Sequence, residues 1–405
     1  MSYTDKQMKD ATQLAYMKCF SDAEKRLINS GKQRPFTVRE LIEASFSKKD
    51  ARLKAMEFGD VPDALNFKEL LKYSSLSEGD VERISLLNDE CLDWKVVDIH
   101  DKNDVNGFYG CVLETKDSEA IIAFRGSESD GNNLINDWLL ADLGLLNSTK
   151  TNQQAETERY ADELLEKGII DKYDFIATTG HSLGGNLATH LNVISAVKGR
   201  EKLYEKLKQV VNMDGPGMSH DYLQEYANEI ARTSHKLTHY KWSAIGDLLF
   251  SVPGEEVEFL DSDESILGDM NSLKKAFWRH DTRIIDFTEE GEAKRGKKDK
   301  LSNVLGPVSR LVDKKVRDFI MTAVLAKIEN EFISIDQLKD GIASIAKDFM
   351  AKSDKKPAML DVLTATFKDR EINRSSLDVA TKTFNELKDK VFGFEKEEND
   401  NFVRA

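Results

Sequence analysis

Between residues 95 and 287 the chain alternates short apolar runs with longer amphipathic stretches. The apolar runs have the length and composition of strands and lie at 95–100, 109–115, 120–124, 173–179, 209–213, 237–243 and 283–287. A polar helix is predicted over 153–168, and Leu187, Leu191 and Ile194 lie on one face of a helix that follows the fourth run. Strands that alternate with helices in this way predict an α/β fold with a mostly parallel central sheet and helices on both of its faces.

On either side of this region the pattern is helical. Three predicted helix starts in residues 1–90 have the spacing of a capping box, in which Thr or Asn is followed three residues later by Gln or Glu: Thr4 and Gln7, Thr37 and Glu40, Asn66 and Glu69. Beyond a charged, glycine-containing segment at 289–300, an apolar stripe at helical spacing begins at Val308. The sequence therefore predicts a helical N-terminal segment (1–90), an α/β domain (91–290) and a charged helical C-terminal domain (301–405).

Composition narrows the class of protein. The 405 residues include 40% hydrophobic and 32% charged residues, as expected of a globular protein, and the formal net charge of −14 disfavours a nucleic-acid binder. Cys19, Cys91 and Cys111 are too far apart for a zinc or disulfide pattern and are predicted to be free thiols. The N-terminus has no cationic region followed by an apolar core, and no apolar run is long enough to span a bilayer. These features predict a cytoplasmic protein, or one exported without a Sec signal, with no membrane span.

The segment Gly180-His181-Ser182-Leu183-Gly184-Gly185 lies between a predicted strand and a predicted helix. A serine with glycines two residues before and after it has the pattern of a nucleophile elbow, a tight turn that exposes the hydroxyl of the serine. Bulky side chains at those two positions would clash where the helix leaves the strand. The N–H of Leu183, near the helix N-terminus, is placed to stabilise a developing oxyanion. Ser182 is therefore the candidate nucleophile.

A second motif, Phe124-Arg125-Gly126-Ser127, ends the predicted strand at 120–124, and Asp137-Trp138 follows it. Together with the elbow, this order of motifs resembles the class 3 (fungal-lipase-like) family of α/β-hydrolases, in a bacterial lipase-like branch. The resemblance covers about residues 95–290. It implies an α/β-hydrolase core and an oxyanion hole formed by Ser127 and Leu183.

The chain departs from the family pattern in the region after Ser127. The segment from Ser127 to Trp138 is longer than usual, and Trp138 and Asp142 are separated by one residue more than in the common motif. The lid and acyl groove of the fungal enzymes therefore cannot be transferred to this chain. The apolar segment 139–146 is a candidate lid or groove wall, and a buried helix is an equally good interpretation of it.

In α/β-hydrolases the triad follows the chain order serine, acid, histidine. Asp247 comes after the predicted strand at 237–243 and is the preferred acid, because the resembled family has an aspartate there with Val or Leu two residues later. Asp214, after the preceding strand, is the alternative. Of the seven histidines only His280 follows Asp247, so chain order selects His280 as the general base.

These residues predict a serine hydrolase that needs no metal or cofactor. The resemblance implies that it cleaves carboxylic esters of acyl lipids, as a lipase or phospholipase, through an acyl-enzyme. Two alternatives stay open: a short-chain esterase or thioesterase with the same triad, and a secreted lipase effector whose helical C-terminal region binds a protein partner. A hydrolase fold without activity, acting as a scaffold, is a third.

Overall fold

A mixed β-sheet runs through the centre of the computed structural model, which describes residues 2–45, 76–126, 150–263, 279–299 and 302–310. Within these residues the sheet has eight strands in the order of the chain. Their bounds are β1 Phe36–Thr37, β2 Lys95–Lys102, β3 Phe108–Lys116, β4 Glu119–Phe124, β5 Phe175–His181, β6 Leu207–Met213, β7 Leu237–Lys241 and β8 Glu256–Phe259. Six of these strands, β2 to β7, match the first six predicted runs to within two residues at each end.

The sheet changes from antiparallel to parallel at β4. Strands β1 to β4 pair antiparallel, and a tight turn at Ser118, with φ 63°, joins β3 to β4. From β4 to β8 every neighbouring pair is parallel. Parallel neighbours need a long crossover connection. Helices supply it between β4 and β7, whereas residues 242–255, which contain no helix, join β7 to β8. The predicted α/β sheet is confirmed, with an antiparallel part at one edge.

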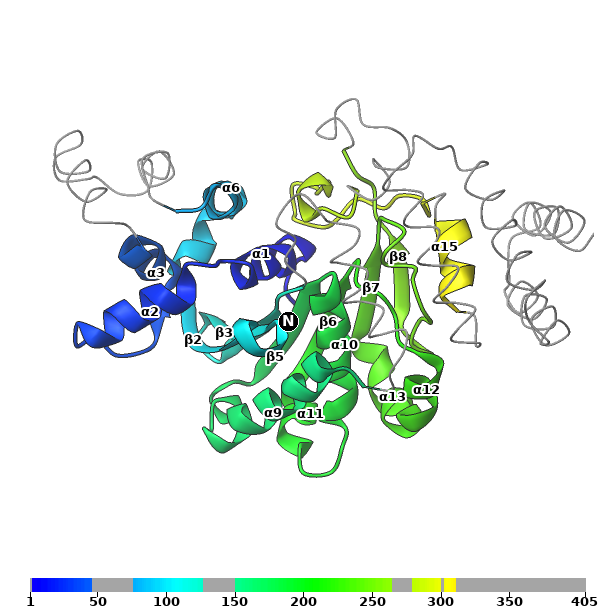
Figure 1. Cartoon of the computed structure of the whole chain (residues 1–405), viewed down its shortest axis with the longest axis horizontal. Helices are drawn as coiled ribbons and strands as arrows, with labels where there is room; N and C mark the ends of the chain where they lie inside the picture. Colours follow the sequence, from blue (N-terminus) through cyan, green and yellow to red (C-terminus); the bar gives the residue numbers. More distant parts are fainter. Residues whose placement is uncertain (1, 46–75, 127–149, 264–278, 300–301, 311–405) are drawn as a thin grey trace, which may run out of the picture.

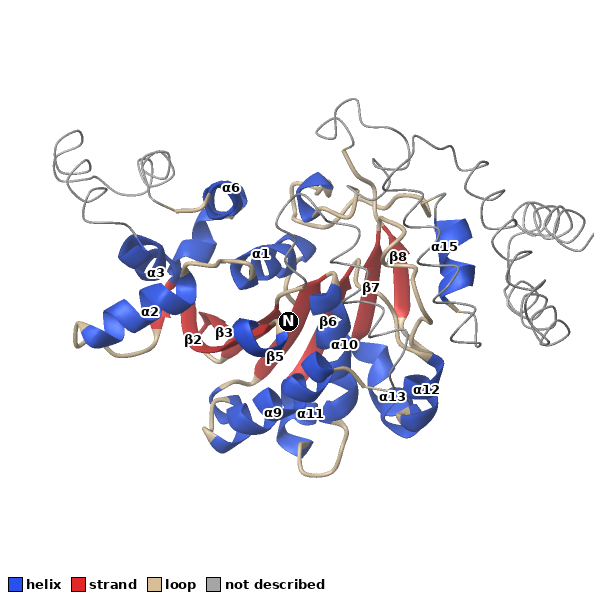
Figure 2. Ribbon diagram, in the orientation of Figure 1, coloured by secondary structure: helices blue, strands red, loops and turns tan. Residues whose placement is uncertain are grey.

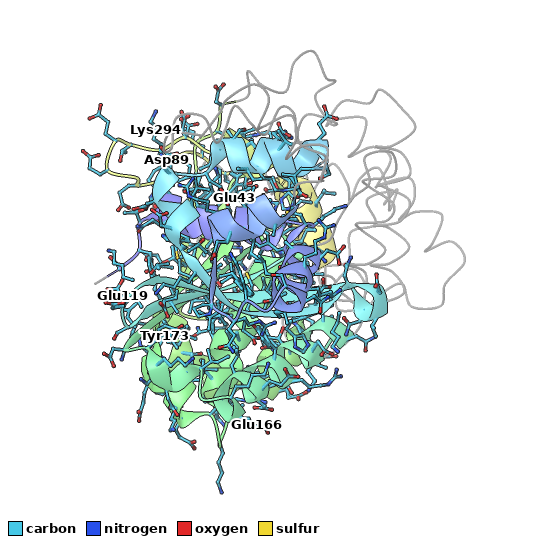
Figure 3. All side chains as sticks on the ribbon, turned by 90° about the vertical axis from the view of Figure 1, so that its left-hand side faces the viewer. Glu43, Asp89, Glu119, Glu166, Tyr173 and Lys294 are labelled. Atoms are coloured by element: carbon cyan, nitrogen blue, oxygen red, sulfur yellow. The ribbon has the colours of Figure 1, made fainter. Side chains whose placement is uncertain are left out.

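Helices cover both faces of the sheet (Figures 1 and 2). One face carries α1 Asp5–Ala15, α2 Phe20–Asn29, α3 Val38–Ser45 and α6 Glu78–Leu86. The other carries α9 Asn152–Glu166, α10 Leu183–Ser195, α11 Glu201–Lys206, α12 His220–Glu225 and α13 Ala227–Thr233. Viewed along the sheet, Glu43 of α3 and Glu166 of α9 lie on opposite sides of Glu119 at the start of β4 (Figure 3).

The alternation of side chains along β3 shows how the sheet separates two apolar cores. Tyr109, Cys111 and Leu113 pack with the N-terminal helices, whereas Phe108 and Val112 pack with α9 and α10. The remaining described elements are short: α7 Asn103–Asn106, α15 Ser302–Ser309, and the 3₁₀ helices η2 Asp89–Asp93, η3 Ile170–Lys172, η4 Ser234–Lys236 and η6 Thr282–Ile284.

The N-terminal helix α1 shares its core with the sheet. Its capping box forms as predicted, with Thr4 and Gln7 bonding each other's backbone N–H. The residues of its apolar face, Met8, Ala11, Leu14 and Ala15, are completely buried. The capping box of Thr37 and Glu40 also forms. The described part of residues 1–90 contains the helices α1, α2, α3 and α6 and the short strand β1.

One predicted strand is wrong. Residues 283–287 do not join the sheet, because the Asp281 side chain accepts the Arg283 N–H at 2.8 Å and turns the chain into η6. Ile285 and Phe287 then form only isolated bridges. The helix start at Asn66, the segment 139–146 and the C-terminal domain beyond Arg310 lie outside the described residues. No helix in the described part of the chain is long and apolar enough to cross a membrane.

The burial of α1 predicts a large stability effect at Leu14. Leu14→Ala should lower the free energy of unfolding by about 2–5 kcal/mol, because the lost transfer energy adds to the cost of a cavity. Urea unfolding followed by fluorescence and circular dichroism measures it. Ile28→Ala in α2, where the side chain is 46% exposed, should cost less than about 1 kcal/mol. An effect at Leu14 as small as that at Ile28 would contradict an N-terminal helix built into the core.

Candidate active site

Ser182 is the single residue between the end of β5 at His181 and the start of α10 at Leu183. Its backbone has φ 59° and ψ −134°, a conformation that costs an L-residue about 1–3 kcal/mol and that persists only where the surroundings impose it. The flanking glycines explain how the turn fits. A Cβ on Gly180 would lie 2.2 Å from the Gly184 carbonyl oxygen, and one on Gly184 would lie 2.4 Å from that of Phe124. The predicted elbow is therefore the observed geometry.

The elbow brings Ser182 to the N-terminus of α10. Leu183 is the first residue of this helix, and the first N–H groups of a helix have no acceptor within it. They carry the positive end of the helix dipole, which favours negative charge beside Ser182. Ser127, the other predicted oxyanion residue, lies outside the described residues. The structure describes the chain up to Gly126, which lies close to the elbow: a Cβ on Gly126 would be 2.9 Å from Ser182 Cβ.

His280 is hydrogen-bonded to the carboxylate of Asp214. Its Nδ1 lies 2.8 Å from Asp214 Oδ2, and Ser243 Oγ also donates to that oxygen. The N–H groups of Trp242 and Ser243 donate to Asp214 Oδ1 at 3.0 and 3.1 Å. The carboxylate is completely buried and held from both sides, so it fixes the orientation of the imidazole ring.

The same contacts keep Asp214 ionised. Burial alone would raise the pKa of the Asp214 carboxyl, but the hydrogen bonds from His280, Ser243 and the Trp242 amide outweigh burial and lower the pKa below its ordinary value. An ionised Asp214 can only accept, so Nδ1 of His280 carries a proton. The Nε2 atom of the neutral ring is then the basic nitrogen.

The acid predicted from the sequence, Asp247, has a different set of partners. Its carboxylate lies 2.7 Å from Lys298 Nζ, 3.3 Å from Arg310 Nη2 and 3.4 Å from Lys241 Nζ. These three cations overcome the effect of burial and hold the pKa of Asp247 far below its usual range. Asp247 therefore anchors Arg310, next to α15, to the turn after β7. The carboxylate that orients His280 is that of Asp214, so the preference for Asp247 is corrected.

Strand order explains the correction. β6 is the parallel neighbour of β5, whereas β7 is one strand further away. His181 pairs with Met213, and the Ser182 N–H donates to the Met213 carbonyl at 3.0 Å. Ser182 directly follows β5 and Asp214 directly follows β6. The two residues therefore lie at the same edge of the sheet. This signal was present in the sequence, where both residues directly follow a strand.

His181, the residue before Ser182, contacts His280, the candidate base. Its Nε2 lies 2.7 Å from the His280 carbonyl oxygen, and the two rings are 4.3 Å apart. Burial, with the nearby His280 as a second cause, lowers the pKa of His181 to about 3. The ring is therefore neutral near pH 7, and Nε2 carries the proton that it donates to the carbonyl oxygen.

Sequence reasoning missed Tyr16, which follows α1. Its hydroxyl oxygen lies 3.1 Å from the Gly126 N–H nitrogen and 3.3 Å from His181 Nδ1. No motif marks this residue, because the contact joins positions 110 residues apart. Within the described ranges, no group of three or more His, Cys, Asp or Glu residues has the arrangement of a metal site.

Comparison with known proteins gives one family match and several solved structures of low sequence identity. A family model described as Mbeg1-like, a class 3 lipase-like family, matches residues 90–292. Among solved structures, a mutant of MDLA from Penicillium cyclopium is 14% identical, with a TM-score of 0.36 over 64% of this chain and 80% of that one. Rhizomucor miehei lipase with its propeptide is 12% identical, with a TM-score of 0.29 over 64% and 70%. A fungal lipase–inhibitor complex is 16% identical, with a TM-score of 0.27 over 43% and 69%. No curated protein matches the chain.

The lowered pKa of Asp247 predicts a pH-dependent contribution to stability. A carboxylate whose pKa is lower in the folded state stabilises the fold above its unfolded pKa, about 3.9, and loses this effect as the pH falls through its folded pKa. Asp247→Asn should therefore lower the free energy of unfolding by about 3 kcal/mol at pH 7, where three cations lose their partner. The deficit relative to wild type should shrink below about pH 4.

Urea unfolding at pH 7, 5, 4 and 3 measures this difference. Asp174→Asn is the matched control, since the Asp174 side chain is 88% exposed and its ion pair with Lys206 spans 3.9 Å. It should change stability by less than about 0.5 kcal/mol at every pH. A deficit for Asp247→Asn that stays constant from pH 7 to pH 3 would show that charge is not its cause.

Proposed function

We propose that this chain, which belongs to the Mbeg1-like family, is a serine hydrolase of carboxylic esters. Ser182 is the nucleophile, His280 the general base, and Asp214 the acid that orients and stabilises His280. One observation carries this proposal. The strained Ser182 lies between β5 and α10, and the neighbouring strand β6 leads directly into Asp214, which is hydrogen-bonded to His280.

In the proposed reaction, Nε2 of His280 accepts the Ser182 hydroxyl proton as the oxygen attacks the ester carbonyl. The positive charge that develops on the ring is stabilised by Asp214, which stays ionised. The oxyanion of the tetrahedral intermediate is held by the N–H of Leu183, at the N-terminus of α10, and by Ser127. His280 then protonates the departing alcohol and leaves an acyl-enzyme on Ser182. Water that loses its proton to His280 hydrolyses this ester and restores the free serine.

The proposed substrates are acyl lipids, such as glycerides or phospholipids. Support for this class comes from the class 3 lipase-like family. A short-chain esterase or thioesterase would use the same residues. A series of p-nitrophenyl esters from C2 to C16, followed by lipid vesicles with products identified by mass, separates these classes by chain length.

The first test is Ser182→Ala. Loss of the nucleophile should lower kcat on the best ester of that series by about five orders of magnitude or more. Ser85→Ala, which removes an exposed hydroxyl from α6, should keep the wild-type rate. Labelling with a fluorophosphonate probe should likewise occur in the wild type and in Ser85→Ala only. A folded, uncontaminated Ser182→Ala protein that keeps its activity would exclude this mechanism.

A second test distinguishes the two aspartates. Asp214→Asn should lower kcat by about 10³- to 10⁴-fold, because an amide cannot hold His280 in the required tautomer or stabilise its positive charge. Asp247→Asn should lower kcat less than tenfold when assayed at a temperature at which it is folded. Initial rates at saturating ester, with circular dichroism to verify folding, give the comparison. The opposite order of losses would return the role of the acid to Asp247.

A further inference from the structure

Tyr16 lies outside the matched family region yet contacts the candidate active site. It follows the last turn of α1 and is 8% exposed. Its hydroxyl accepts the Gly126 N–H at 3.1 Å. Gly126 immediately precedes Ser127, so this bond fixes the last described amide before the predicted oxyanion residue.

The same hydroxyl also contacts His181. Because Nε2 of His181 donates to the His280 carbonyl, Nδ1 of the neutral ring is an acceptor. The Tyr16 hydroxyl, which accepts from Gly126, can therefore donate to Nδ1 at 3.3 Å or to the His181 carbonyl at 3.4 Å. A continuous chain of hydrogen bonds thus runs from Gly126 through Tyr16 and His181 to the backbone of His280.

The packing around Gly126 shows how closely these groups meet. A Cβ at this position would lie 2.4 Å from the Tyr16 hydroxyl oxygen, 2.6 Å from the His181 carbonyl oxygen and 2.9 Å from Ser182 Cβ. Only glycine fits between them. The Tyr16 hydroxyl and the side chain of Ser182, the candidate nucleophile, therefore both lie next to the Cα atom of Gly126.

Helix α1 also binds the segment that carries His280. Gln13 donates from its side chain to Thr282, two residues after His280. At the other end of the helix, the Asp5 carboxylate accepts the Ala293 N–H at 2.9 Å, and the Lys6 N–H donates to the Gly291 carbonyl at 3.0 Å. Tyr16 therefore extends from an element that is already fixed to the base-bearing segment.

We propose that Tyr16 is a positioning residue of the active site, whose hydroxyl sets the distance between the oxyanion-hole backbone at Gly126 and the Ser182–His280 pair. The role rests on the proposed serine-hydrolase function. It makes the end of the N-terminal helix, which lies outside the matched residues 90–292, part of the proposed active site.

Tyr16→Phe isolates the hydroxyl. The ring keeps its contacts with the Arg83 guanidinium, 5.2 Å from the ring centroid, and with the His181 ring at 6.0 Å. Displacement of the oxyanion-hole backbone should lower kcat by about ten- to a hundredfold, with KM within twofold of wild type. The inhibition constant of a trifluoromethyl ketone should rise by the same factor as kcat/KM falls, because its tetrahedral adduct also places an oxyanion there.

Tyr3→Phe is the matched control. It removes another tyrosine hydroxyl from the N-terminal segment, one that is bonded to Thr115 Oγ1 at 2.6 Å. This variant should keep both kcat and the inhibition constant. Thermal unfolding of both variants should show similar, small changes in Tm.

Three results would overturn the role of Tyr16 while the proposed function stands: wild-type kcat in a folded Tyr16→Phe protein, a rise in KM alone, or equal losses in Tyr3→Phe. A rate loss without the matching loss of inhibitor affinity would also overturn it. A wild-type protein without Ser182-dependent turnover would instead overturn the proposed function, and the positioning role would fall with it. Measuring wild type and Ser182→Ala in the same assay separates the two failures.

Discussion

The parallel pairing of β5 with β6 is the constraint on which the site depends. The register that joins His181 to Met213 puts the next residue of each strand at the same edge of the sheet, one a strained serine and the other a buried aspartate. Asp214 also has a positive φ, 51°, so both strands leave the sheet through unfavourable backbone conformations. Strain of this kind persists only where hydrogen bonds and packing on all sides impose it. Here they are the backbone bond from Ser182 to Met213 and the amides of Trp242 and Ser243, directly after β7, which donate to Asp214.

Asp214 and Asp247, two buried aspartates near the ends of neighbouring strands, differ in role because their side chains have different partners. Asp214 faces one histidine and neutral donors, an arrangement in which a proton can be taken up and released at the ring. Asp247 contacts two lysines and an arginine instead, so it has no imidazole ring to orient. Both carboxylates are ionised and both are almost fully buried. Only the first has the partner that acid–base chemistry requires.

Local physical rules predicted much of this molecule. The elbow glycines follow from a clash at short range, and the capping boxes at Thr4 and Thr37 from hydrogen bonds three residues apart. The order serine, acid, histidine holds for both Asp247 and Asp214, so the choice between them depended on which strand pairs with β5, a contact between distant parts of the chain. The segment 283–287 had the composition of a strand, but the Asp281 side chain turned it before it could pair. Tyr16 had no local signal, because both of its partners in the site are more than a hundred residues away.

The contacts of α1 with the segment around residues 282–293 have a consequence for biosynthesis. Gln13 and Thr282 are 269 residues apart in the chain, and Asp5 and Ala293 are 288 apart. Closing loops of this length costs entropy before any contact compensates for it, and folds rich in distant contacts form slowly. During translation, α1 can form these contacts only after most of the described chain has left the ribosome. The proposed active site cannot be complete before residues 280–293 have been synthesised, and a growing chain that already carries Ser182 lacks His280, the proposed base.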